Sequence, residues 1–240
     1  YHILLEKPMT NTLEEVDKLE NLAINYPNQV FMVCHVLRYT PFFSTIKRLI
    51  DEGAIGKIAS IQHNENIGYY HMAHSFVRGN WRNSVETSPI ILAKSCHDFD
   101  ILNFLVGAKC IKIASFGNLQ HFKKECMPLK ASSRCIDCLI ESDCPYSALK
   151  LYPQNIGKWP TSVITENQTE EGVKEALAHG PYGRCVYCCD NDVMDHQVTI
   201  LEFENGVSAT FNLSAFTHEV TRTIKIMGSK GEIRGHMGFN

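Results

Sequence analysis

Two short segments, far apart in the chain, hold side chains suited to acid–base chemistry. The first is Glu6-Lys7-Pro8, directly after an apolar run, and the second is Lys94-Ser95-Cys96-His97-Asp98. An imidazole can take the proton of an alcohol while a hydride leaves the same carbon. A nearby ammonium group stabilises the developing alkoxide and lowers the pKa of the imidazole. These residue types suit oxidation of a secondary alcohol, with His97 as the base and Lys7 or Lys94 as the cation.

The second segment is predicted to lie on one helix, from about residue 91 to about residue 105. At 3.6 residues per turn, Lys94, His97 and Asp98 would share one stripe of this helix. The ammonium group and the imidazole would then lie within one turn of each other. A histidine on an amphipathic helix is often a packing residue instead, and that interpretation of His97 stays open.

Both segments resemble active-site segments of the Gfo/Idh/MocA oxidoreductases, the NAD(P)-dependent sugar and inositol dehydrogenases. Further segments that resemble the family follow in its order along most of the chain. They include Arg38-Tyr39-Thr40-Pro41, Gly53-Ala54-Ile55-Gly56-Lys57, Trp81-Arg82 and Met227-Gly228-Ser229-Lys230-Gly231. The resemblance implies an oxidoreductase that transfers a hydride between a sugar or polyol hydroxyl and NAD or NADP.

The resemblance also implies roles for single residues. Lys7 would lie beside the nicotinamide and polarise the substrate oxygen, and His97 would be the acid/base, assisted by Lys94. The residues expected at the cofactor are Glu6, Lys7, Pro8, Arg38, Trp81 and Arg82. Arg38 could equally be a structural ion-pair partner. Family members commonly carry an aspartate where this chain has Ala93, so Lys94 is expected to take over part of that role.

A polar and aromatic stretch from residue 69 to residue 82 adds candidates for substrate binding. Aromatic rings there could stack on a sugar, and polar groups could hydrogen-bond its hydroxyls. The residues expected at the substrate are Tyr70, His74, Lys94 and Asp98. The competing interpretation is a loop whose histidines are at the surface with satisfied hydrogen bonds.

The start of the chain resembles the end of a nucleotide-binding domain. No Gly-x-Gly-x-x-Gly turn follows an apolar run in this sequence, so the phosphate-binding turn is expected upstream of Tyr1. We therefore interpret residues 1–36 as the C-terminal remnant of a Rossmann domain. Residues 37–240 are interpreted as a substrate-binding and dimerisation domain of the α+β class.

That second domain is predicted to contain an open, mostly antiparallel sheet with helices on one face, as the resemblance to a glyceraldehyde-3-phosphate-dehydrogenase-like C-terminal domain implies. A helix is expected over residues 41–51. Apolar alternation predicts strands at residues 58–66, 111–116, 197–203, 207–214 and 221–226. The late strands are expected to form an antiparallel meander, with a tight turn at Asn205-Gly206. The uncovered sheet face is expected to pair with a second copy, giving a homodimer or homotetramer.

Seven of the ten cysteines fall in a stretch from about residue 120 to about residue 189, which looks like a subgroup insertion. Cys135-x-x-Cys138 followed by Cys144 could hold one ion, with a fourth thiolate from Cys185 or Cys189. Zinc is the first interpretation, with Cys135, Cys138, Cys144 and Cys185 as ligands. An iron–sulfur cluster and simply reduced thiols remain alternatives. Few apolar residues are expected to be buried in this segment, so bound metal would supply much of its folding free energy.

Composition narrows the remaining classes. The chain is 44% hydrophobic and 20% charged, as is ordinary for a globular protein, and its net charge of −3 disfavours a nucleic-acid partner. No apolar run approaches the length that crosses a bilayer, and we expect a cytoplasmic protein without a membrane partner. Two other functions stay open: an NAD-dependent glycosidase that oxidises its sugar transiently, and a non-catalytic dimerisation module.

Overall fold

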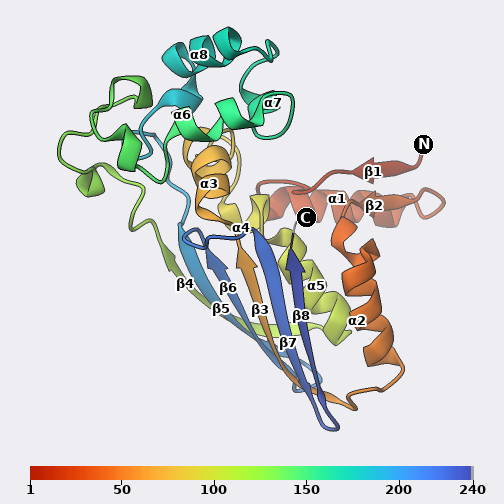
Figure 1. Ribbon diagram of the computed structural model, residues 1–240. Helices are drawn as coiled ribbons and strands as arrows, with labels where there is room; N and C mark the ends of the chain where they lie inside the picture. Colours follow the sequence, from red (N-terminus) through yellow and green to blue (C-terminus); the bar gives the residue numbers. More distant parts are fainter. Residues whose placement is uncertain (239–240) are drawn as a thin grey trace.

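The computed structural model describes residues 1–238 and has three parts (Figure 1). A small N-terminal unit lies beside one end of a six-stranded sheet. Helices cover one face of that sheet, and a largely helical insertion lies at the same end as the N-terminal unit. None of the helices in the described residues is long and apolar enough to cross a membrane.

The N-terminal unit is a βαβ arrangement. Strands β1 (Ile3–Leu5) and β2 (Phe31–Val33) are parallel neighbours, joined by helix α1 (Leu13–Asn25). Strand β1 is not buried, because Ile3 and Leu4 are 50% and 67% exposed. Two strands and one helix are too few to cover both faces of such a sheet.

The large sheet has the strand order β4-β5-β6-β3-β7-β8. Its strands are β3 (Ile58–Asn66), β4 (Cys110–Asn118), β5 (His196–Phe203), β6 (Ser208–Ser214), β7 (Thr221–Gly228) and β8 (Glu232–Gly238). Four of the five pairings are antiparallel, and β3 and β6 run parallel. The predicted open, mostly antiparallel sheet is confirmed. The predicted meander is wrong, because β3 enters between β6 and β7 and separates them.

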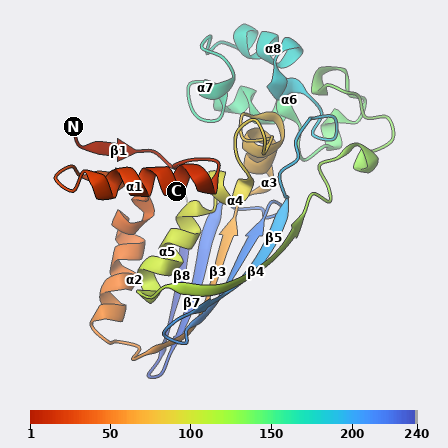
Figure 2. The ribbon, with the colours of Figure 1, turned by 180° about the vertical axis from the view of Figure 1, so that it is seen from behind.

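Two helices pack on one face of this sheet (Figure 2). Helix α2 (Pro41–Asp51) has the predicted bounds, and Thr40 caps it by accepting a hydrogen bond from the backbone N–H of Phe43. Phe43 is fully buried in the core between helices and sheet, where an aromatic side chain contributes about 1.5–3 kcal/mol of burial free energy.

The predicted single helix around His97 is interrupted. The chain forms a short α4 (Ile90–Ala93) and then α5 (Cys96–Val106), with Lys94 and Ser95 in a turn between them. The backbone N–H of Ser95 donates to the carbonyl of Ile90, five residues back. This wider turn changes the angular phase of the residues that follow, so Lys94 does not continue the stripe of α5.

The insertion connects β4 to β5 and has its own small core. Two short helical segments follow β3: α3 (Tyr69–His71) and a π-helical stretch (Met72–Arg78). The insertion contains α6 (Ala148–Leu151), α7 (Thr161–Ile164) and α8 (Glu170–His179), together with several three-residue 3₁₀ turns. A four-residue 3₁₀ helix (Val36–Tyr39) precedes α2. Tyr152, Val173 and Leu177 are buried together. The expectation that the insertion buries few apolar groups is therefore wrong.

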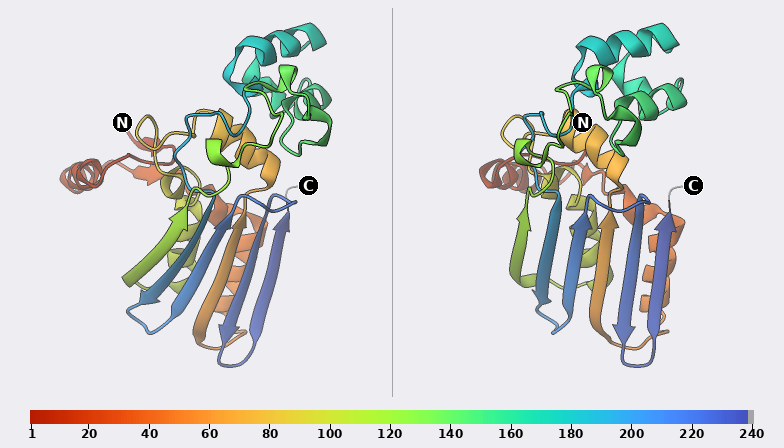
Figure 3. Two further views of the ribbon diagram at one scale, coloured as in Figure 1. Left: turned by 90° about the vertical axis from the view of Figure 1, so that its left-hand side faces the viewer. Right: turned by 60° about the vertical axis from the view of Figure 1, so that its left-hand side comes forward.

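Within residues 1–238, no helix covers the second face of the sheet (Figure 3). Phe116 of β4 lies opposite Val198 of β5, and Ile200 follows on the same face. Their exposed fractions are 77%, 45% and 53%. Towards β3 and β6 the same face becomes polar, with Gln62 opposite Thr210.

Candidate active site

The two chemistry-bearing segments meet in the structure. Nζ of Lys7 donates a hydrogen bond of 2.9 Å to the carbonyl oxygen of Ala93, at the end of α4, across 86 positions of sequence. A cavity of about 170 Å³ lies between them and is lined by Lys7, Pro8, His35, Leu92 and Cys96 among others. The N-terminal unit and the helices of the second domain thus form one candidate site.

His97 lies on α5 next to this contact. Its ring is 5.9 Å from that of His35, edge to face. Burial lowers the pKa of His97 to about 4, and the positive charge of Lys7 and then of Arg222 acts in the same direction. The imidazole is therefore neutral near pH 7, the form that accepts a proton. Its Nδ1 is buried without a hydrogen-bond partner.

A buried charge network lies behind α5, against the sheet. Arg222 on β7 pairs with two carboxylates: its Nη2 is 2.6 Å from Oε2 of Glu65, and its Nε is 2.8 Å from Oδ1 of Asp98. Nε2 of His63 also lies 2.8 Å from Oδ1 of Asp98. Nζ of Lys94 is 3.0 Å from Oε1 of Glu65. The contacts of Asp98 with His63 on β3 and with Arg222 on β7 hold α5 against these two strands.

This network changes two of the predicted substrate contacts. The Asp98 side chain is fully buried among His63 and Arg222, so in this structure it cannot reach a substrate and instead fixes the helix that carries His97. The Arg222 guanidinium and His63 hold its pKa well below the usual range, against the opposing effect of burial. Lys94 is partly exposed, and its pair with Glu65 fixes the direction of its ammonium group.

Sequence reasoning did not single out Glu65, Arg222, His63 or His35. A signal for two of them was present: His63 and Glu65 alternate with Ile61 on the buried side of β3, and polar residues on a buried strand face require partners. Arg222 gave no such signal, because an arginine in a strand is usually at the surface.

Tyr70 lines a groove between the helical stretch 69–78 and the insertion. The groove has a volume of about 570 Å³, and Tyr69, Tyr146, Lys150 and Trp159 also line it. Aromatic faces beside a few polar groups suit a sugar or polyol. His74, predicted to bind substrate, is instead buried: its ring stacks on Tyr182, and its Nδ1 lies 3.0 Å from the Tyr152 hydroxyl.

The two arginines among the predicted cofactor residues, Arg38 and Arg82, form ion pairs. Nε of Arg38 donates to Oδ2 of Asp100 at 2.7 Å. Nε of Arg82 donates to Oδ1 of Asp190 at 2.9 Å, which ties the Trp81-Arg82 loop to the end of the insertion. No contact of either arginine tests a cofactor role, so both remain predictions.

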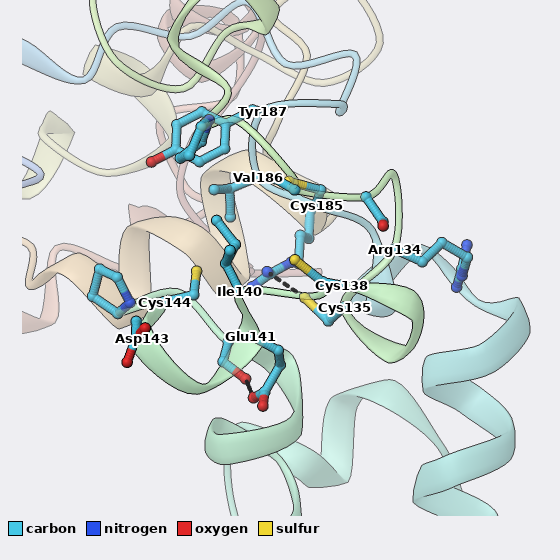
Figure 4. Close-up of a pocket in the computed structure, with 16 residues that line it drawn as sticks. Arg134, Cys135, Cys138, Ile140, Glu141, Asp143, Cys144, Cys185, Val186 and Tyr187 are labelled. Carbon is cyan, nitrogen blue, oxygen red and sulfur yellow. Dashed lines mark hydrogen bonds between the residues drawn. The ribbon is translucent and has the colours of Figure 1, made fainter.

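The four predicted metal ligands gather in one place. Cys135, Cys138, Cys144 and Cys185 all line a cavity of about 130 Å³ in the insertion (Figure 4). All ten cysteines are free thiols, and burial raises the pKa of Cys185 to about 11. Within residues 1–238, however, no group of three or more His, Cys, Asp or Glu side chains is arranged to hold a metal ion. The structure therefore does not support the predicted zinc ion.

The described residues combine an open, mostly antiparallel sheet, helices on one face of it, and a βαβ unit whose Lys7 contacts the end of α4. The chain belongs to the Gfo/Idh/MocA oxidoreductase family: its residues 47–239 match the model described as "Oxidoreductase family, C-terminal alpha/beta domain".

Comparisons with individual proteins agree with this membership. YteT of Bacillus subtilis (strain 168), which carries a provisional oxidoreductase name, is 24% identical over 240 residues, covering 98% of this chain and 54% of YteT. The scyllo-inositol 2-dehydrogenase (NAD(+)) of the same organism is 29% identical over 121 residues, or 49% of this chain and 32% of that protein. The chain spans about half or less of the length of these curated relatives.

A solved structure shows the same fold. The scyllo-inositol dehydrogenase from Lactobacillus casei, crystallised with NAD(H) and scyllo-inositol, superimposes with a TM-score of 0.60 at 17% identity. The match covers 98% of this chain and 50% of that one.

Proposed function

We propose that this chain supplies the substrate side of an NAD(P)-dependent dehydrogenase that acts on a hydroxyl of a sugar or polyol. The observation that carries the proposal is the hydrogen bond from Lys7 to the end of α4, which places a cation close to the neutral imidazole of His97 on the next helix. The two inositol dehydrogenases among its relatives support the reaction class, because both act on scyllo-inositol with a nicotinamide cofactor, as their names state.

The residues present fit a nicotinamide group. Glu6, Lys7 and Pro8 directly follow β1 of the βαβ unit, and the cavity beside Lys7 opens between that unit and α5. A bound nicotinamide accepts the hydride. His97, neutral at pH 7, accepts the hydroxyl proton. Lys7 polarises the hydroxyl oxygen, and Lys94, held by Glu65, adds positive charge at its partly exposed end.

The groove lined by Tyr70 and Trp159 recognises the rest of the substrate in this proposal. Its aromatic side chains cover an apolar ring face, while Lys150 and Gln154 offer polar contacts to hydroxyl groups. Arg38, Trp81 and Arg82 are retained as cofactor contacts, with Arg38 and Arg82 oriented by Asp100 and Asp190.

The test is reduction of NAD or NADP by the full-length protein with a panel of inositols, aldoses and aldonic acids. We expect reduced cofactor to accumulate with at least one cyclic polyol or sugar. Release of nitrophenol from nitrophenyl glycosides with catalytic NAD, and no net reduction, would indicate the glycosidase reaction instead. Absence of any cofactor binding would favour a non-catalytic module.

We also propose that the uncovered sheet face pairs with a second copy of the chain. Phe116, Val198 and Ile200 form an exposed apolar patch there, which association would remove from water. Light scattering should give at least a dimer mass, and Val198→Glu should shift it towards the monomer. Lys174→Glu, at an exposed position of α8 away from the sheet, is the control. A monomeric wild-type mass at micromolar concentration would contradict the proposal.

A further inference from the structure

Four thiols from the two ends of the insertion's helical part line one cavity. Cys135 begins a 3₁₀ turn (Cys135–Asp137), Cys138 and Cys144 follow such turns, and Cys185 lies close behind another. The backbone N–H of Cys185 donates to the carbonyl of Ser133 at 2.8 Å, which holds the two ends of the insertion together. The cavity is thus built by backbone pairing and is lined by sulfur from three separate segments (Figure 4).

The same cavity is lined by a buried cation. Arg78 is 1% exposed; its Nε donates to the carbonyl of Arg184 at 2.7 Å, and its Nη2 donates to the carbonyl of Tyr146 at 2.7 Å. Nη2 also points at Sγ of Cys135, 3.5 Å away, and Nη1 is buried with no partner.

No carboxylate in residues 1–238 forms an ion pair with Arg78, although Glu141 and Asp143 also line the cavity. An uncompensated buried charge costs several kcal/mol. The surroundings of Arg78 therefore favour an anion bound in this cavity.

We propose that Cys135, Cys138, Cys144 and Cys185 ligate a [4Fe–4S] cluster. A zinc ion requires four sulfurs at about 2.3 Å from one point, and the side chains do not form such a group. A cluster brings its own irons and sulfides, so its cysteines attach at separate corners around a cavity. The Cys-x-x-Cys pair and the Cys144-Pro145 step are also features of cluster-binding sequences.

A cluster bound by four thiolates is an anion, which compensates the charge of Arg78. The hydrogen bond from Nη2 to Sγ of Cys135 becomes a charge-assisted bond of the kind that tunes such clusters. Arg78, Cys144, Pro145 and Ser147 line both this cavity and the groove that contains Tyr70. The cluster thus fixes one wall of the groove without taking part in the proposed hydride transfer.

The test is analysis of the full-length protein purified without oxygen from cells supplied with iron and cysteine. We expect about four irons and about four acid-labile sulfides per chain, with a broad visible absorption that bleaches on reduction with dithionite. Cys138→Ser should lower iron content at least several-fold. Cys126→Ser is the matched control and should retain the iron. Cys126 lies in the same insertion, but its Sγ donates a hydrogen bond to the Gln120 carbonyl.

Two results would overturn the proposal. One is about one zinc per chain with no sulfide, which would identify a single-ion site. The other is protein without bound metal, even after reconstitution with ferrous iron and sulfide, whose four cavity thiols all react with a thiol reagent. Both measurements are made on the wild-type protein, so they do not depend on the folding of a variant.

Discussion

Two arginines are buried in residues 1–238, Arg78 and Arg222, and they differ in whether a carboxylate neutralises their charge. Arg222 lies between sheet and α5 and contacts the carboxylates of Glu65 and Asp98. Arg78 lies between the π-helical stretch and the insertion and contacts backbone carbonyls and one thiol. The first charge is compensated within the chain, and the second is not. The difference separates a region that is complete in itself from one whose electrostatics require a further group.

The largest expected effect concerns the compensated region. Arg222→Met would leave Asp98 and Glu65 buried with much less positive charge nearby, so we expect it to lower the free energy of unfolding by about 3–5 kcal/mol. Urea unfolding followed by circular dichroism measures the change. Arg234→Met is the control, because Arg234 pairs with Glu232 at the surface and should cost less than about 1 kcal/mol. Equal effects of the two variants would mean that the network does not hold α5.

The next effect concerns the chemistry that this region supports. His97→Ala and Lys7→Ala should each lower kcat of the full-length enzyme about a hundredfold, as loss of a positioned base or of a charge stabiliser does. His179→Ala removes a histidine exposed on α8 and should leave kcat unchanged. Near-normal turnover of His97→Ala with a good substrate would exclude His97 as the base.

The pH dependence of the free energy of unfolding tests the surroundings of Arg78, where His74 lies. Burial, followed by the charge of Arg78, lowers the pKa of His74 to about 4. The unfolded chain, with a histidine pKa near 6.5, therefore binds more protons than the folded chain below about pH 6.5. The contribution of His74 is full at pH 7 and should fall by about 1 kcal/mol per pH unit as the pH drops from 6.5 towards 4.

His74→Gln should flatten this slope, while His179→Gln should not, because His179 is exposed. Unfolding in urea at several pH values between 7 and 5 measures both slopes. Identical slopes for the two variants and the wild type would mean that His74 does not titrate at a lowered pKa.

The smallest effect is expected at Arg38. This side chain is 38% exposed, and its forked pair with Asp100 is partly screened by water, so Arg38→Lys should cost less than about 1 kcal/mol in unfolding. The same variant tests its proposed cofactor role. A KM for NAD(P) raised several-fold would support that role, and an unchanged KM would leave Arg38 as a purely structural partner of Asp100.

Local pattern was enough to predict much of the fold. Residues 41–51 and 58–66 form the expected helix and strand with the expected bounds. The helix was predictable because its apolar residues recur at helical spacing and Pro41 suits its first position. Strand β8 was not expected: its sequence, Glu232 to Gly238, is polar and contains glycine, and it forms at the sheet edge beside β7. The parallel pairing of β3 with β6 joins distant segments and leaves no local trace.

The candidate site was predictable only in part. The pairing of Lys7 with the segment of His97 was expected from motif order, and the structure brings the two together. The break at Lys94 and Ser95 was not expected. The spacing of residues along a helix does not show that Lys94 pairs with Glu65 on a distant strand. Burial of Asp98 and His74 depends on distant strands and on the insertion, which periodicity alone does not place.

The position of the insertion has a consequence for how this protein can change. Asn118 and His196 are the last paired residues of two neighbouring antiparallel strands, and Asp195 accepts hydrogen bonds from the backbone N–H groups of Gln120 and His121 at the same point. Everything between is therefore an enlarged hairpin loop with a clamped base. The entropic cost of closing a loop rises only slowly with the number of residues in the loop. The insertion can therefore be replaced by another, or shortened to a tight turn, without a change in strand order. Under the proposed function, substrate recognition can diverge there while Lys7 and His97 keep their positions.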